Sequence, residues 1–130
     1  MDIREISAVW ESALELPVWD GPKVWVHGDL SSGNLLSIDG RLSAVIDFGA
    51  LGVGDPAVDL IIAWNLLPAE VRPGFRSQTV VDEATWKRGR AWALSIALIQ
   101  LPYYFQTNLP LAENARYVIG EVLADYRGED

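Results

Sequence analysis

The order of apolar and polar residues predicts short extended segments near the start of the chain and helices elsewhere. Apolar residues recur at helical spacing from Ile3 to Leu14, which predicts an amphipathic helix ending near residues 16–17. Residues 24–26 (Val-Trp-Val) follow a cluster of turn-forming residues. They predict a short buried strand.

Two further apolar runs, over residues 34–38 and 41–46, are separated by Asp39-Gly40. Asp-Gly is a favoured two-residue hairpin turn because both turn positions require a positive φ angle. The sequence therefore predicts a β-hairpin over residues 34–46.

An unbroken hairpin register would pair Ile38 with Arg41 and Asn34 with Val45. Side chains alternate between the two faces of a strand, so Asp47 would lie on the same side as Asn34, about 7 Å away or less. A carboxylate and a carboxamide at this separation can hold one metal ion or two adjacent ones. Asp29, on the loop before the hairpin, can face the same space.

The rest of the chain is predicted to be mainly helical. Asp55-Pro56 provides an N-cap and a first-turn proline for a helix that ends near residue 67. The other expected segments are a glycine-containing loop over 48–54, a loop over 68–81, a long buried helix from Asp82 to about Phe105 and a last helix over about 111–126. We therefore expect a single domain over residues 1–130, with an α+β, mainly helical fold and a small β-hairpin at its active edge.

Composition narrows the functional classes. The net charge of −8 argues against nucleic acid and membrane surfaces as partners, since both attract basic patches. The absence of cysteine excludes disulfides and thiolate chemistry. The start of the chain lacks the features of a signal peptide, and the most apolar stretch, residues 91–101, is too short to span a bilayer. We expect a cytoplasmic protein.

The most informative motif consists of two polar clusters that flank the predicted hairpin. His27-Gly28-Asp29 is followed by Asn34, five residues after the aspartate, and Asp47-Phe48-Gly49 comes directly after the hairpin. Phosphoryl transfer uses a carboxylate that orients the attacking hydroxyl, together with oxygen ligands that hold Mg²⁺ against the phosphates. The order and spacing of these residues match the protein-kinase signature.

The surrounding residues extend the match beyond a generic kinase motif. His-Gly-Asp-Leu at 27–30, Asn-Leu-Leu at 34–36 and Val-Ile-Asp-Phe-Gly-Ala-Leu-Gly-Val-Gly-Asp-Pro-Ala-Val-Asp-Leu at 45–60 closely resemble the aminoglycoside phosphotransferase family, within the protein-kinase-like superfamily. The resemblance implies the C-terminal lobe of a protein-kinase-like fold. It also implies an ATP- or GTP-dependent O-phosphotransferase acting on a hydroxyl of an aminoglycoside-like antibiotic or a related metabolite.

The resemblance implies a role for each motif residue. Asp29 would be the catalytic base, and Asn34 and Asp47 would be the Mg²⁺ ligands. Asp55 and Asp59 would support the catalytic loop from behind. We interpret His27 as a residue that shapes this loop through hydrogen bonds to its backbone, not as a catalyst.

The N-terminal lobe of the family is not expected in this sequence. In the family that lobe covers the nucleotide phosphates and supplies a lysine that holds them. Only twenty-six residues precede His27, and neither Lys23 nor Lys87 lies where that lysine is needed. We expect the partner to be a separate N-terminal lobe or a second copy of the chain. The alternative function is an inactive remnant lobe that binds a ligand or a partner.

The substrate is expected between the hairpin edge and the helices after residue 82. The candidate substrate-binding residues are Tyr103, Tyr104, Gln106, Asn108 and Glu113. The carboxylates of the last helix either attract a polyamine or form a solvated face. Aminoglycoside, macrolide and other metabolite hydroxyls all remain candidate acceptors.

Overall fold

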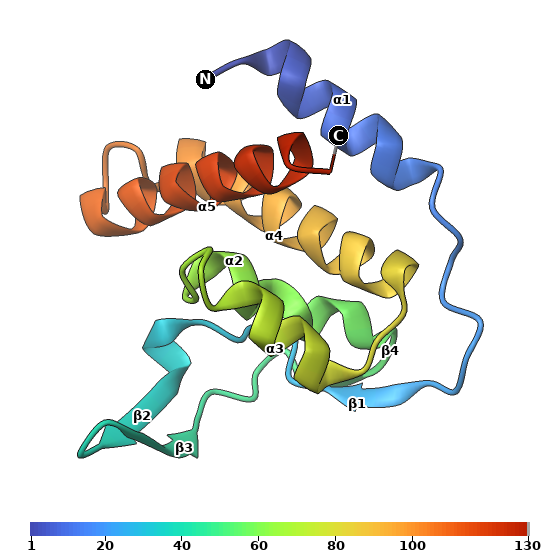
Figure 1. The fold of residues 1–130 in the computed structure, drawn as a ribbon. Coiled ribbons are helices and arrows are strands. Elements are labelled where there is room, and N and C mark those ends of the chain that lie inside the picture. Colours follow the sequence, from blue (N-terminus) through green and yellow to red (C-terminus); the bar gives the residue numbers. More distant parts are fainter. Residues whose placement is uncertain (130) are drawn as a thin grey trace.

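The computed structural model describes residues 1–129 and is built mainly of helices (Figure 1). In chain order the elements are α1 (Ile3–Leu14), β1 (Val24–Val26), the short 3-10 helix η1 (Ser32–Asn34), β2 (Leu35–Ile38), β3 (Arg41–Val45), β4 (Gly52–Gly54), the 3-10 helix η2 (Pro56–Ile61), α2 (Ile62–Asn65), α3 (Arg72–Thr79), α4 (Glu83–Tyr104) and α5 (Leu109–Arg127). The predicted α+β, mainly helical fold is confirmed.

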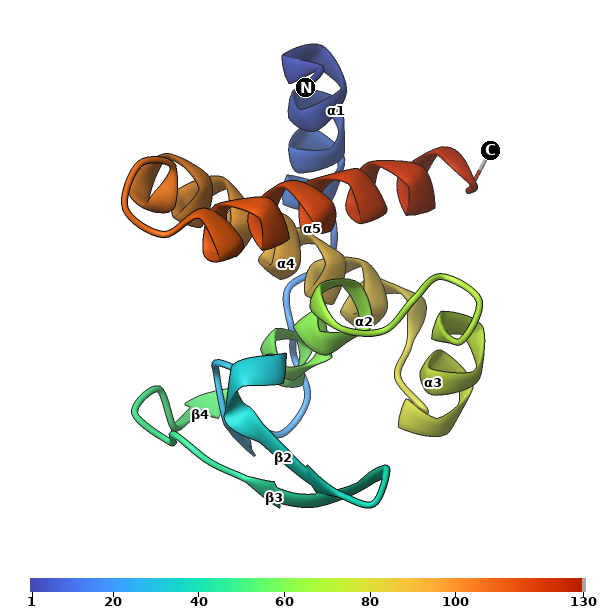
Figure 2. The same ribbon diagram turned by 90° about the vertical axis from the view of Figure 1, so that its left-hand side faces the viewer.

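Helix α4 is the centre of the helical body, with α5 packed along it and α1 lying across both (Figure 2). The core is continuous, and its largest fully buried side chain, Trp64 of α2, packs on Trp86 of α4 with ring centroids 4.9 Å apart. The expectation that α4 is buried holds for one side only, because Trp92 and Ile99 on its outer side are exposed. No helix within residues 1–129 combines the length and apolar character that crossing a membrane requires.

Close packing between α4 and η2 depends on Gly89. A Cβ atom at this position would lie 2.7 Å from Cβ of Leu60 and 3.0 Å from the carbonyl oxygen of Ala57. Any larger side chain would therefore push α4 away from the segment that follows the active edge.

Two segments predicted as loops form regular structure. The prediction for 68–81 is wrong because α3 forms there. Proline is tolerated in the first turn of a helix, and Phe75 packs against Trp86, so tertiary contacts support a segment with a weak helical pattern. The prediction for 48–54 missed β4, which is only three residues long and pairs antiparallel with β1.

The hairpin of β2 and β3 projects from the helical body (Figure 1). Its turn is the predicted Asp39-Gly40, with φ angles of 52° and 77°. The second two-stranded sheet, of β1 and β4, lies at the base of the loop that carries Asp29. Together they form the β side of the molecule.

Candidate active site

The loop that follows β1 turns sharply at Gly28. Its φ angle is +89°, and a Cβ atom there would lie 2.6 Å from the carbonyl oxygen of Ala50. Only glycine combines this conformation with such a close approach of two backbones. The turn leaves the side chain of the next residue, Asp29, exposed.

The side chain of Asp59 stabilises this loop through hydrogen bonds to its backbone. Its two carboxylate oxygens accept hydrogen bonds from the backbone N–H groups of His27 and Gly28, both at 3.0 Å. Charge-assisted hydrogen bonds of this kind are stronger than those between neutral groups. Asp59 therefore fixes the backbone directly before Asp29.

His27 connects the loop to the end of the hairpin. The ring is buried, with Nε2 2.8 Å from the carbonyl oxygen of Ile46 and Nδ1 3.1 Å from the backbone N of Asp29. Since Nδ1 accepts from an N–H group, we assign the proton to Nε2, which donates to Ile46. The ring also packs on Phe48, at 4.9 Å between centroids. The buried ring of His27 thus links the loop of Asp29 to the end of the hairpin.

Asn34 lies beside Asp29. Its Nδ2 donates to the backbone carbonyl of Asp29 at 2.7 Å and to its Oδ2 at 3.2 Å. The short helix η1 brings the two residues together by turning the chain just before β2. These contacts orient the Asp29 carboxylate and direct the amide nitrogen of Asn34 away from any metal, leaving its Oδ1 as a potential ligand.

The predicted hairpin register is confirmed next to the turn, where Ile38 pairs with Arg41, but it is wrong by one residue at the open end. Leu35, not Asn34, pairs with Val45, because a β-bulge between Leu36 and Ser37 shifts the pairing. The backbone carbonyl oxygen of Asn34 instead accepts a hydrogen bond from the backbone N–H of Ile46 at 2.9 Å. Strand alternation therefore does not put Asp47 on the side of Asn34 as expected, since a one-residue shift exchanges the two faces.

Asp47 leaves the strand in a left-handed conformation, with a φ angle of 59°. This breaks the alternation of the hairpin and re-aims its side chain, which is exposed; its Oδ1 accepts a hydrogen bond from Gly49 at 3.4 Å. Within residues 1–129 no three His, Cys, Asp or Glu side chains converge on a possible metal position. An amide and a carboxylate oxygen nevertheless suit Mg²⁺, which takes few protein ligands and keeps water and phosphate oxygens.

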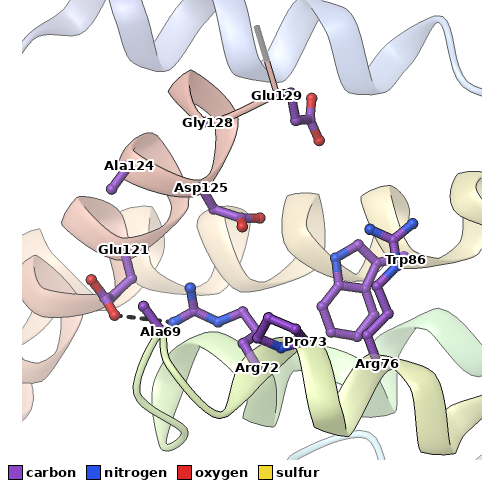
Figure 3. Close-up of a pocket in the computed structure, with 10 residues that line it drawn as sticks. All are labelled: Ala69, Arg72, Pro73, Arg76, Trp86, Glu121, Ala124, Asp125, Gly128 and Glu129. Carbon is purple, nitrogen blue, oxygen red and sulfur yellow. Dashed lines mark hydrogen bonds and ion pairs between the residues drawn. The ribbon is translucent and has the colours of Figure 1, made fainter.

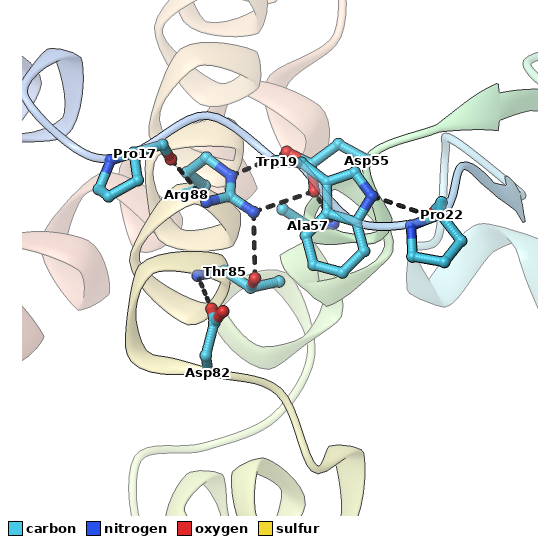
Figure 4. Close-up of polar contacts among 8 residues, drawn as sticks. All are labelled: Pro17, Trp19, Pro22, Asp55, Ala57, Asp82, Thr85 and Arg88. Carbon is cyan, nitrogen blue, oxygen red and sulfur yellow. Dashed lines mark hydrogen bonds and ion pairs between the residues drawn. The ribbon is translucent and has the colours of Figure 1, made fainter.

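Asp55 has a partner that the sequence did not indicate. As predicted, it caps η2 by accepting from the backbone N–H of Ala57, but it also pairs with Arg88 of α4 (Figure 4). Arg88 Nε lies 2.8 Å from Asp55 Oδ2, and Nη1 donates to the carbonyl oxygen of Pro17 at 2.8 Å. Arg88 therefore connects Pro17, before β1, and Asp55, after β4, to the long helix α4.

A cavity of about 330 Å³ opens next to Asp29, between the catalytic loop, α4 and α5. Five neutral polar residues that were not predicted site residues also line it: Ser31, Ser32, Asn65, Gln100 and Asn114. The predicted residues Tyr103, Tyr104, Gln106, Asn108 and Glu113 are not among the residues that line this cavity. The packing of α2, α4 and α5 against one another selects the side chains that face this cavity, so a sequence pattern does not reveal them.

A second, larger cavity of about 430 Å³ lies away from the motif residues (Figure 3). Its charged groups are largely paired: Arg72 with Glu121 at 3.0 Å, and Arg90 with Asp125 and Glu129. Trp64 Nε1 also donates to Asp125. The pairs hold α5 to α3 and α4.

The family model of the "Phosphotransferase enzyme family" matches residues 2–92. The chain belongs to the phosphotransferase enzyme family. Among sequence relatives, it is 38% identical to an aminoglycoside 3'-phosphotransferase of Escherichia coli over 75 residues, which are 57% of this chain and 27% of that protein. Similar matches to aminoglycoside 3'-phosphotransferases include one from Salmonella typhimurium, 37% identical over 62 residues, or 48% of this chain and 23% of that protein.

Solved phosphotransferase structures share the fold. An apo thermostable mutant of aminoglycoside phosphotransferase APH(4)-Ia aligns over 98% of this chain and 47% of its own, with a TM-score of 0.57 and 26% identity. A second structure of that enzyme, a ternary complex with AMP-PNP and hygromycin B, aligns over 95% of this chain and 45% of its own, with a TM-score of 0.54 and 28% identity. This member of the phosphotransferase enzyme family thus spans about a quarter of its sequence relatives and under half of these structures.

Proposed function

We propose that this chain carries the catalytic lobe of a nucleotide-dependent O-phosphotransferase that acts on a small-molecule hydroxyl, in an aminoglycoside-like antibiotic or a related metabolite. The observation that carries the proposal is the hydrogen-bonded pair of Asp29 and Asn34 at the edge of a ligand-sized cavity. Membership of the family and the AMP-PNP complex of a relative support the same reaction.

Asp29 is proposed as the base. Its Oδ2 accepts from Asn34, so Oδ1 stays available to accept the proton of the attacking hydroxyl. Asp59 and His27 contribute by fixing the backbone on which Asp29 stands. This division of labour fits phosphoryl transfer, in which catalysis consists mainly of positioning and electrostatic stabilisation.

Asn34 and Asp47 are the residues that would hold Mg²⁺, through Asn34 Oδ1 and the Asp47 carboxylate. When bound, the ion neutralises charge on the phosphate oxygens. The nucleotide is ATP or GTP. The hydrogen bond from His27 to Ile46 keeps the segment before Asp47 close to the loop of Asp29.

We further propose that the β side of the lobe contacts a nucleotide-binding lobe, contributed by another polypeptide segment or another copy of the chain. Trp25 and Val53 form a cross-strand pair in the β1–β4 sheet, yet they are 73% and 54% exposed. Ile38 and Leu42 near the hairpin tip are similarly exposed. Exposed apolar side chains on both sheets are consistent with a contact surface on the β side.

Titration with Mg²⁺ and a non-hydrolysable nucleotide tests the metal assignment. Asp47→Asn is expected to weaken Mg²⁺-dependent nucleotide binding at least about tenfold, because the site loses a formal charge. Asp39→Asn is the matched control, since Asp39 also adopts a left-handed conformation but lies at the hairpin tip. Equal affinities in both variants would remove Asp47 from the proposed metal site.

Phosphoryl transfer itself is tested by adding a separately produced N-terminal lobe from a relative and measuring nucleotide consumption. We expect the added lobe to restore turnover, and Asp29→Asn to abolish it. A lobe that binds the chain without restoring turnover would favour the alternative of an inactive lobe that binds a ligand or partner.

A further inference from the structure

The cavity beside Asp29 is nearly free of charge. Of the described residues that line it, only Asp29 has an acidic or basic side chain. Its polar wall is made of neutral groups that include Asn65, Gln100 and Asn114. Its apolar wall includes Ile61, Ile96, Leu111 and Val118.

Of the three carboxylates of α5, Glu113 is exposed to solvent and is not among the residues that line this cavity, and the other two, Glu121 and Asp125, are directed elsewhere. Asn114 and Val118 face the cavity of Asp29, whereas Glu121 and Asp125 line the second cavity (Figure 3). There Glu121 pairs with Arg72, and Asp125 pairs with Arg90. These carboxylates are therefore neither near the proposed acceptor site nor free to bind a cationic ligand.

Asn65 provides a neutral polar group that is already oriented. Its Nδ2 donates to the carbonyl oxygen of Leu30 at 2.8 Å, one residue after Asp29, and its buried Oδ1 has no hydrogen-bond partner in the described structure. This hydrogen bond fixes the Asn65 amide in the cavity wall next to the loop that carries Asp29.

We propose that the acceptor substrate is a neutral polyol carrying an apolar group, such as a glycoside, and not a polycation. The inference rests on the proposed phosphotransfer function and, of the two acceptor classes named there, selects the related metabolite over the polycationic aminoglycoside. A ligand with several ammonium groups would lose their hydration in this cavity and gain only Asp29 as an ionic partner, which is unfavourable. A neutral ligand can place hydroxyls on Asn65 and Asn114 and its apolar group against Ile96 and Leu111.

Calorimetric titration of the intact chain, without nucleotide, tests the proposal with three probes: methyl β-D-glucoside, hexyl β-D-glucoside and hygromycin B. Hexyl glucoside is expected to bind at least about tenfold more tightly than methyl glucoside because its chain is buried. Raising the salt to about 0.5 M should change its affinity less than about twofold, whereas attraction of hygromycin B to the acidic surface should disappear.

Substitutions at two neighbouring exposed residues of α5, Asn114 and Glu113, test whether hexyl glucoside binds in this cavity. Asn114→Trp fills the cavity mouth and should weaken hexyl glucoside binding at least about tenfold, while Glu113→Trp, outside the cavity, should leave it unchanged. Asn114→Asp adds a carboxylate of nearly the same shape and should increase the affinity for hygromycin B.

Two results would overturn the proposal. One is hexyl glucoside binding that is absent or insensitive to Asn114→Trp. The other is hygromycin B binding that survives about 0.5 M salt and is weakened by Asn114→Trp. Neither result depends on Mg²⁺ or nucleotide, so they leave the proposed phosphotransfer reaction to its own tests. Conversely, if the nucleotide-binding and turnover tests failed while glucoside binding remained intact, only the proposed phosphotransfer reaction would be refuted.

Discussion

Nε2 of His27 lies 2.8 Å from the carbonyl oxygen of Ile46, so one buried ring joins the loop of Asp29 to the residue before Asp47. The other ring nitrogen accepts from the backbone N–H of Asp29. The proposed base and the proposed metal ligand therefore belong to one hydrogen-bonded unit. A substitution that displaces the loop around His27 should therefore affect the positions of both Asp29 and Asp47.

Gly28→Ala is expected to destabilise the chain by about 2 to 4 kcal/mol. The substitution combines a strained positive φ angle with a Cβ atom 2.6 Å from the carbonyl oxygen of Ala50. The control, Gly33→Ala in the same loop, has open space and should change the free energy of unfolding by less than about 0.5 kcal/mol. Urea unfolding measures both, and equal effects would contradict the close approach of Gly28 to Ala50.

Asp59→Asn is expected to cost about 2 kcal/mol of stability, because an amide offers one acceptor where the loop presents two N–H donors. Amide hydrogen exchange at His27 and Gly28 should accelerate at the same time. Asp39→Asn, at the exposed hairpin turn, serves as the matched control. Unchanged exchange at His27 in Asp59→Asn would show that the carboxylate does not hold the loop.

The pairing of Arg88 with Asp55 is expected to appear as a coupling energy of about 1 kcal/mol in a double-mutant cycle. The two side chains are mostly shielded from water, which limits screening. Asp55→Asn keeps the cap on η2, and Arg88→Met keeps the packing of the side-chain stem, so the cycle isolates the ion pair. Unfolding measurements on the four proteins give the coupling, and a value near zero would remove Arg88 as a support of the site.

Acid should weaken the start of α4 through Asp82. Hydrogen bonds to the side chain and backbone of Thr85 lower the pKa of Asp82 from its ordinary value of 3.8. Because the folded-state pKa is lowered, this contribution to stability is fully present above about pH 4 and is lost as the pH falls through the folded-state value. Asp82→Asn keeps a capping oxygen without titrating, so its urea midpoint should fall less than the wild-type midpoint between pH 5 and 3, at about equal ionic strength. An equal decrease of the urea midpoint in the wild type and in Asp82→Asn would contradict the lowered pKa of Asp82.

Local signals account for most of what could be predicted. The Asp39-Gly40 turn, the Asp55 cap and the start of α4 at Asp82 each act within about four residues, and each prediction is confirmed. The spacing of Asp29, Asn34 and Asp47 likewise matched the protein-kinase signature, and the residues around them indicated the family. The assignment of these residues to individual steps stays a prediction.

Long-range packing decided the rest. The bulge that moves Asn34 opposite Ile46, the strand β4 and the helix α3 have no distinct pattern in the sequence, since each depends on a partner remote in the chain. The same holds for Arg88 beside Asp55. The sequence by itself thus determined the family and the chemical groups of the site. Only the tertiary structure decided which neutral side chains of α4 and α5 surround Asp29, because contacts between helices, not local propensity, select the faces that meet.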